Sequence, residues 1–292
     1  MTRFVPSRPM SSIRHLLDRN RAWASRITAE HPGFFQGLAA QQAPRYLWIG
    51  CADSRVPANE IVDLAPGELF VHRNVANVVV HTDFNCLSVL QFAVDVLRVE
   101  HVMVVGHYRC GGIRAALEET SHGLIDNWLR HVQDVALRHK PLLDRRDDPD
   151  WRVDRLCELN VVEQVVHVAR TTIVEEAWQR GQPLALHGLV YGLEDGILRD
   201  LGIEAASTAE LRSHYAPAIA RCAGNDVPDL GAELLRQGAA VVDADESGPL
   251  IDLYKTTEAE AKRAARGLWS SKFEMPWAFR ARAGSTATRP AP

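Results

Sequence analysis

Residues 45–50 and 101–106 read RYLWIG and HVMVVG, two short apolar runs that each end in glycine. Continuous apolar runs of this length are typical of strands buried on both faces of a parallel sheet. Each is followed by residues that carry chemistry, CADSR at 51–55 and HYRCGG at 107–112. We therefore predict an α/β fold with a mostly parallel central sheet flanked by helices. Both polar segments should lie at the carboxyl edge of the sheet, where open α/β sheets bind ligands.

These segments bring two thiols and an imidazole to one edge of the predicted sheet, from Cys51, His107 and Cys110. A lone cysteine after a strand is usually a small buried apolar residue. Here His107 and Cys110 are close enough in sequence to reach one metal ion, and Gly111 and Gly112 let the backbone turn tightly around it. Thiolate and imidazole are ligands that Zn²⁺ prefers, and three protein ligands with an open fourth position are typical of catalytic sites. The sequence thus predicts a catalytic site with one Zn²⁺ per chain.

The chain from about residue 10 to about residue 220 resembles the β-class carbonic anhydrases, especially the bacterial members. The resemblance implies the β-carbonic anhydrase fold for residues 1–220, the same three zinc ligands, and Asp53 and Arg55 as the catalytic pair. It rests on the Cys-x-Asp-Ser-Arg and His-x-x-Cys-Gly-Gly segments and on three longer stretches, at residues 70–77, 85–89 and 187–192.

The chemistry of carbon dioxide hydration needs these residue types. Zinc can lower the pKa of a bound water from about 15.7 to roughly 7, and the resulting hydroxide can attack carbon dioxide to give bicarbonate and a proton. Asp53 can accept a hydrogen bond from that hydroxide, or bind zinc itself as a conditional fourth ligand. Arg55, always charged and forked, can hold the Asp53 carboxylate away from the metal. We predict a zinc lyase that interconverts carbon dioxide and bicarbonate.

A second set of residues predicts regulation. The resemblance extends to bacterial members in which bicarbonate binds a non-catalytic site built from a tryptophan, an arginine and a tyrosine. Bicarbonate there favours a closed form in which the aspartate replaces water on zinc. Trp48, Arg73 and Tyr191 occupy the matching positions. Allosteric control by bicarbonate is therefore expected.

Composition and charge exclude several other classes of protein. The 292 residues are 46% hydrophobic and 24% charged, which is ordinary globular usage, and the formal net charge is only −4. No basic stripe with interleaved aromatic residues indicates nucleic-acid binding. Neither a signal peptide nor an apolar run of about 18 residues is present, so we expect no membrane partner. Five cysteines, of which Cys86 and Cys157 fit helical apolar patterns, suit a reducing cytoplasm.

The periodicity of apolar residues predicts the main helices. A helix over residues 12–29 would, by the family resemblance, reach over a partner subunit, in a homodimer or a dimer of dimers. Another begins after a cap at Thr82 or Asp83. A long helix is expected from 153 to 180, after a polar loop at 143–151 and before a strand at 183–188.

The last part of the chain, residues 221–292, continues beyond the extent expected of the family. It resembles the C-terminal half of a thermonuclease-like domain and is expected to be a small, mainly helical extension. Thr257 and Glu260 form a capping box for one helix there. The barrel strands and the calcium-binding and phosphate-binding residues belong to the half that this sequence does not contain, so we predict no nuclease activity.

Two alternatives to carbon dioxide hydration remain open. Hydrolysis of carbon disulfide or carbonyl sulfide uses the same fold and ligand spacing. A non-catalytic scaffold stabilised by zinc would need neither Asp53 nor Arg55, so the presence of both favours an enzyme.

Overall fold

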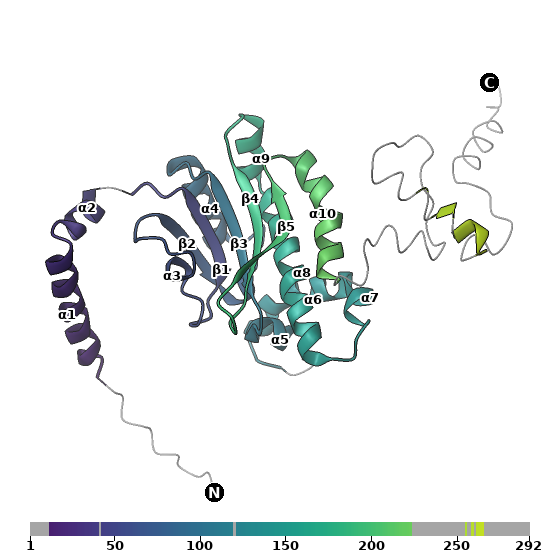
Figure 1. Ribbon diagram of the computed structural model, residues 1–292, viewed down its shortest axis with the longest axis horizontal. Coiled ribbons are helices and arrows are strands. Elements are labelled where there is room, and N and C mark those ends of the chain that lie inside the picture. Colours follow the sequence, from purple (N-terminus) through teal and green to yellow (C-terminus); the bar gives the residue numbers. More distant parts are fainter. Residues whose placement is uncertain are drawn as a thin grey trace, which may run out of the picture.

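A computed structural model describes residues 12–40, 42–118, 121–223, 255, 258–259 and 261–265. Its centre is a five-stranded sheet in the order β2-β1-β3-β4-β5 (Figure 1). The first four strands of that order run parallel, and β5 pairs antiparallel with β4. This confirms the predicted α/β class. The strands are β1 (Tyr46–Cys51), β2 (Leu69–Asn74), β3 (His101–His107), β4 (Ala185–Tyr191) and β5 (Leu198–Ala205).

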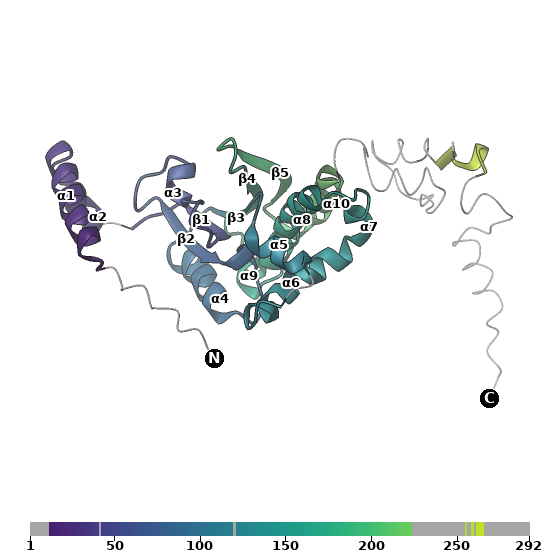
Figure 2. The ribbon, with the colours of Figure 1, turned by 90° about the horizontal axis from the view of Figure 1, so that it is seen from below.

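Helices connect the strands and cover the sheet. Figure 2 shows α3 on one face and α4 and α9 on the opposite face. The helical elements are α1 (Arg14–Glu30), α2 (Phe34–Ala40), α3 (Ala58–Ile61), η1 (Val75–Asn77), α4 (Phe84–Gln91), η2 (Phe92–Val96), α5 (Gly111–Leu117), α6 (Ile125–Arg138), α7 (Lys140–Leu143), α8 (Pro149–Ala169), α9 (Thr172–Gln179) and α10 (Thr208–Cys222). None of the described helices has the length and apolar composition needed to cross a bilayer.

Helix α8 is the centre of the larger core and packs directly on β3 and β4. Two strand glycines make the close approach possible. A Cβ atom at Gly106 would lie 2.6 Å from a methyl group of Val161 on α8, and one at Gly188 would lie 3.2 Å from methyl groups of Val161 and Val165 on the same helix. A second apolar cluster, containing Trp48, covers the sheet face that carries α3. The strand ends are thus held rigidly from both sides.

The single long helix predicted over residues 153–180 is wrong, because the chain breaks it into α8 and α9. The hydroxyl of Thr171 caps α9 by accepting a hydrogen bond from the Val174 backbone N–H at 3.3 Å. The apolar periodicity runs through the break, which hides it in the sequence. Helix α8 also starts earlier than predicted, inside the expected polar loop, because the Asp148 carboxylate accepts bonds from two backbone N–H groups of its first turn.

The two ends of the chain differ from the core. Helix α1 has no buried residue, and both ribbon views show α1 and α2 standing apart from the sheet (Figures 1 and 2). Helix α10 runs past residue 220, where we expected the first domain to end, and buries Cys222 completely. Most of the predicted extension at 221–292, including Thr257 and Glu260, lies outside the described residues.

Candidate metal centre

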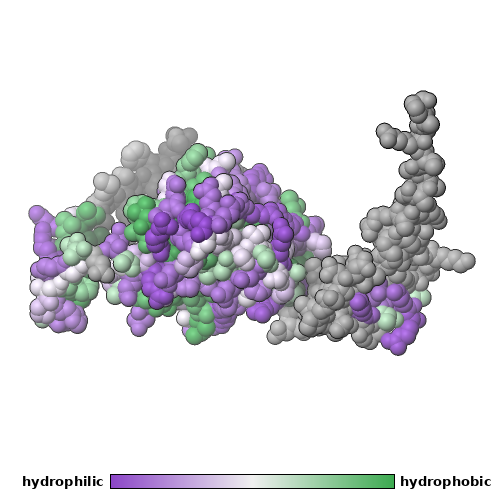
Figure 3. Space-filling model, turned by 90° about the horizontal axis from the view of Figure 1, so that it is seen from above, coloured by the Kyte–Doolittle hydropathy of each residue, from purple (hydrophilic) through white to green (hydrophobic). Residues whose placement is uncertain are grey.

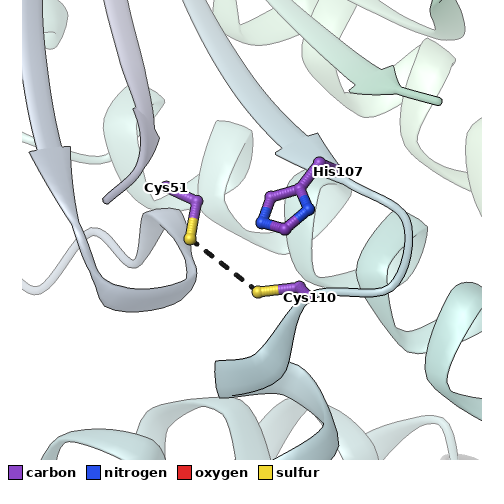
Figure 4. Close-up of side chains that lie close together, drawn as sticks. All are labelled: Cys51, His107 and Cys110. Carbon is purple, nitrogen blue, oxygen red and sulfur yellow. Dashed lines mark hydrogen bonds between the residues drawn. The ribbon is translucent and has the colours of Figure 1, made fainter. Parts of the chain in front are cut away.

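The predicted metal ligands lie together at the carboxyl edge of the sheet. Cys51 is the last residue of β1, His107 is the last residue of β3, and Cys110 directly precedes α5. All three side chains are buried, and their ligand atoms lie within 4.8 Å of one another. Figure 4 shows the imidazole and both sulfur atoms turned toward one space. The structure thus brings together the three residues that the sequence predicts as metal ligands.

The donor set fits Zn²⁺. Tetrahedral zinc with Zn–S bonds of about 2.3 Å requires two sulfur ligands roughly 3.8 Å apart, and the Sγ atoms of Cys51 and Cys110 are 3.8 Å apart. Nδ1 of His107 lies 2.9 Å from the Tyr108 carbonyl oxygen and can donate to it, which leaves the lone pair on Nε2. Nε2 is buried and has no hydrogen-bond partner among the described residues. A bound metal would satisfy this atom.

Hydrogen bonds around the sulfur atoms favour thiolate at Cys51. The pKa of Cys51 is lowered, first by the hydrogen bond from the Cys110 thiol, against the opposing effect of burial, and then by the His107 side chain and the backbone N–H groups of Asp53 and Ala76. The pKa of Cys110 is raised, first because its proton is held in the bond to Cys51 and then because it is buried.

Asp53 and Arg55 form a bidentate ion pair at the rim of this centre. Nε of Arg55 donates to Oδ1 of Asp53 at 2.9 Å, and Nη2 donates to Oδ2 at 2.7 Å. The backbone N–H of Arg55 also donates to Oδ1, at 2.9 Å. These bonds from Arg55 hold the pKa of Asp53 well below its ordinary value. Oδ2 of Asp53 lies 3.8 Å from Nε2 of His107, so the carboxylate faces the metal position while Arg55 holds it.

The three residues of the predicted bicarbonate site are placed as follows. Trp48 is fully buried, and its indole Nε1 has no hydrogen-bond partner within the part of the chain that the structure describes. Tyr191 is half-buried and packs in the same apolar cluster. Arg73 donates from Nε to the Cys51 carbonyl oxygen at 2.8 Å and from Nη2 to the Asp53 carbonyl oxygen. Arg73 thereby ties the backbone between the zinc ligand and the carboxylate.

The loop between His107 and Cys110 is held by residues that were not predicted from the sequence. The Tyr108 hydroxyl donates to the buried carboxylate of Glu158 on α8 at 2.5 Å, and Arg155 pairs with the other oxygen at 2.8 Å. Arg109 has a φ of +57°, and its backbone N–H donates to Asp154 at 3.2 Å. A signal was available in the sequence, because Asp154 and Glu158 are acidic residues one turn apart on a helix that also carries a long apolar stripe.

Comparison with known proteins gives one consistent result. The family model for carbonic anhydrase matches residues 46–198, just over half of the chain. A carbonic anhydrase of Emericella nidulans is 47% identical over 189 residues, which span 65% of this chain and 83% of the relative.

Two solved structures agree with this match. A β-carbonic anhydrase from Coccomyxa superposes with a TM-score of 0.67 at 38% identity, covering 70% of this chain and 92% of its own. One of two tetrameric β-carbonic anhydrases from Sordaria macrospora gives a TM-score of 0.63 at 38% identity, covering 66% of this chain and 98% of its own. With the Cys-His-Cys centre at the edge of a mostly parallel sheet, these similarities show that the chain belongs to the carbonic anhydrase family and to its β class.

Proposed function

We propose that this enzyme hydrates carbon dioxide reversibly to bicarbonate and a proton at the centre formed by Cys51, His107 and Cys110. The observation that carries the proposal is the spacing of the three buried donor atoms, which suits tetrahedral zinc, with Asp53 held beside them. Zinc bound by these three residues would act as a Lewis acid and make hydroxide available near neutral pH.

The protein's own contribution is to hold the acid beside the reaction. We assign Asp53 the role of accepting a hydrogen bond at the metal position, which orients the attacking oxygen toward carbon dioxide. Arg55 keeps the carboxylate charged and in place through its two parallel bonds. If Asp53 left Arg55, its carboxylate could take the open ligand position, and the enzyme would be switched off.

Carbon dioxide hydration by stopped flow above pH 8, with zinc measured by elemental analysis, tests the proposal. Cys110→Ala is expected to lose zinc and activity together. The control is Cys86→Ala, since Cys86 is buried away from the ligands with a thiol pKa raised by burial to about 12. A Cys110→Ala enzyme that retains a full equivalent of zinc would contradict the ligand set, and a zinc-loaded wild type without hydration activity would contradict the function.

We also propose that Trp48, Arg73 and Tyr191 form a bicarbonate site that regulates the enzyme. The unpaired buried N–H of Trp48 supports it, because a bound anion would supply the missing acceptor. Arg73 supports it too, because it holds the Asp53 backbone and so links an anion to the carboxylate. Bicarbonate can shift the equilibrium only by its differential affinity for the state with Asp53 on the metal.

Initial hydration rates from pH 6.5 to 9 test this regulation. The wild type should have almost no hydration activity below about pH 7.5. Its rate should then increase with pH more steeply than the loss of a single proton allows, and added bicarbonate should move this increase to higher pH. Trp48→Phe and Tyr191→Phe should raise activity at low pH. If the rate instead follows the loss of a single proton, and bicarbonate acts only as an inhibiting product, the regulatory proposal is wrong. Trp48, Arg73 and Tyr191 would then serve only in packing and ion pairing.

The enzyme is further proposed to be a cytoplasmic homo-oligomer. Apolar side chains are exposed on α1 and on the α4 and η2 segment, where Phe84 is 79% exposed and Val96 62%. Figure 3 shows hydrophobic surface on the separate α1 helix. Apolar surface of this kind suits a second copy of the chain, and the related Sordaria macrospora enzymes are tetrameric. For residues 221–292 we propose no nuclease activity, so the full chain should not cleave single-stranded DNA or RNA with calcium present.

A further inference from the structure

Two consecutive residues beside the metal centre have an unusual backbone. Ala76 and Asn77, in η1, have φ values of +64° and +47°. Asparagine tolerates the left-handed conformation, but at Ala76 it costs free energy that the surroundings must offset. Both residues are almost completely buried, with 0% and 2% exposure. Something in the fold must hold this segment in place.

Buried amide groups on α8 hold one side of the segment. Nδ2 of Asn160 donates to the Ala76 carbonyl oxygen at 2.9 Å. Nε2 of Gln164, one turn further along the helix, donates to Oδ1 of Asn160 at 3.0 Å, while its Oε1 accepts from the Val79 backbone N–H at 2.8 Å. Asn160 and Gln164 are both 0% exposed. Because no water competes for these groups, their bonds fix the orientation of the peptide between Ala76 and Asn77.

An indole on α6 holds the other side. Nε1 of Trp128 donates to the Val75 carbonyl oxygen at 2.8 Å, which orients the peptide that joins Val75 to Ala76. Helix α5 closes the remaining space, since a Cβ atom at Gly112 would lie 2.8 Å from a methyl group of Val75. Each peptide that flanks Ala76 therefore has its own hydrogen-bonding partner from a helix.

The group placed by these bonds is the backbone N–H of Ala76, which lies close enough to the sulfur of Cys51 to be one of the groups that lower its pKa. The neighbouring backbone is in register with the ligand strand, because Asn74 pairs with Cys51 and the Ala52 N–H donates to the Asn74 carbonyl at 2.8 Å. A shift in the Ala76 peptide would therefore be felt at the ligand. Groups that orient metal ligands from behind contribute to metal affinity.

We propose that Asn160 and Trp128 are positioning residues of the metal centre, which hold the strained Ala76 peptide so that its N–H meets the Cys51 ligand. The inference rests on the proposed zinc function. Neither residue contacts a metal ligand through its own hydrogen bond, so both act through Ala76. Removing either bond should let η1 populate relaxed conformations that lack the N–H to sulfur bond, and zinc affinity should fall in proportion to the fraction of correctly formed sites.

The sharpest test compares two tryptophans in the full-length enzyme. Trp128→Phe and Trp178→Phe each delete one indole N–H bond to a backbone carbonyl, both of 2.8 Å, with Trp178 bonded to Leu184 away from the metal. Zinc dissociation constants are measured by competition with a chromophoric chelator. We expect Trp128→Phe to raise the constant about threefold or more, with Asn160→Leu raising it roughly 10- to 100-fold. Trp178→Phe should leave the zinc dissociation constant unchanged, although the melting temperature of this variant should also fall.

Two further readouts separate positioning from general damage. With Co²⁺ in place of zinc, the thiolate-to-cobalt absorption band should shift in Trp128→Phe and Asn160→Leu but not in Trp178→Phe. Adding Ala76→Gly to Asn160→Leu should recover part of the lost zinc affinity, because glycine adopts the left-handed conformation without strain. If Asn160→Leu fails to fold, Trp128→Phe decides the matter.

The outcomes distinguish this inference from the proposed function. Zinc stoichiometry and hydration by the wild type test the function alone. If both are as proposed but Trp128→Phe keeps the zinc affinity and cobalt spectrum of Trp178→Phe, the positioning role is wrong and the enzyme assignment stands. If the wild type binds no zinc at the three ligands, both proposals fail.

Discussion

Asp53 separates metal binding from catalysis at the scale of single residues. Its carboxylate lies beside the metal position without being one of the three buried donors, so Asp53→Asn should keep a full equivalent of zinc. Hydration above pH 8 should nevertheless fall by roughly 10²- to 10⁴-fold, the range for loss of a positioned proton-accepting group. Asp18→Asn, which removes a carboxylate from an exposed ion pair on α1, is the control. Unchanged turnover in Asp53→Asn would remove Asp53 from the mechanism.

Arg55 allows a second test of the same pair. Arg55→Lys keeps the positive charge but cannot reproduce the two parallel bonds to the carboxylate. Asp53 would then be free to occupy the open ligand position. We expect reduced hydration with zinc retained, and a loss in Arg55→Lys nearly as large as in Arg55→Ala. Full activity in Arg55→Lys would show that charge alone, without the fork, is sufficient.

At the scale of elements, the contact between α8 and β3 controls how His107 is presented. Gly106→Ala would force a Cβ atom into a methyl group of Val161, and overpacking of this kind costs about 1–3 kcal/mol of the free energy of unfolding. Val161→Ala should restore part of that loss in the double variant, a coupling that urea unfolding can measure. Gly37→Ala is the control, because a Cβ atom there meets nothing within 4 Å. Additive effects at 106 and 161 would contradict the close contact.

Three helices converge on one buried carboxylate, that of Glu163 on α8. Arg138 at the end of α6 pairs with it, His139 binds it at 2.8 Å, and the Tyr215 hydroxyl on α10 donates to it at 2.6 Å. Burial alone would raise the pKa of Glu163, but the hydrogen bonds from His139 and Tyr215 and the charge of Arg138 lower it overall. Glu163→Gln should therefore lower the free energy of unfolding by about 2 kcal/mol or more at pH 7.

The pH dependence of that loss has a definite sign. Because the folded-state pKa of Glu163 is depressed, its charge stabilises the protein above the ordinary glutamate pKa, and this contribution disappears as pH falls through the lowered value. The difference between wild type and Glu163→Gln should accordingly shrink in acid. Glu100→Gln, in an exposed pair with Arg45, should change little at any pH. A difference that grows toward low pH would contradict the assignment.

How much the sequence predicts also depends on scale. The strands and the Cys51, His107 and Cys110 cluster follow from local patterns, because apolar runs that end in glycine place the next residue at the sheet edge. The break at Thr171 does not, since apolar periodicity continues through it and a threonine cap outweighs it. Nor could the bond from Asn160 to Ala76 be predicted, because it joins residues 84 positions apart. Such long-range polar contacts depend on packing that no local pattern encodes.

At the scale of the whole molecule, α1 presents apolar side chains to solvent and takes no part in the described core. Burial would stabilise the protein by roughly 1.5–3 kcal/mol for each of its exposed apolar residues, and none is buried by the part of the chain that the structure describes. They are Ile13, Leu16, Leu17 and Trp23. A second copy of the chain is the surface that we propose they cover.

Removing residues 1–40 should then leave the sheet intact but weaken assembly. We expect an unchanged far-ultraviolet circular dichroism spectrum per residue of the core, together with a lower molar mass by light scattering at equal protein concentration. The full-length variant Leu16→Ser/Leu17→Ser/Trp23→Ser should dissociate in the same way, because it keeps the length of the arm and removes only its apolar face. An unchanged molar mass in both proteins would place the subunit interface elsewhere, on the exposed apolar residues of α4 and η2.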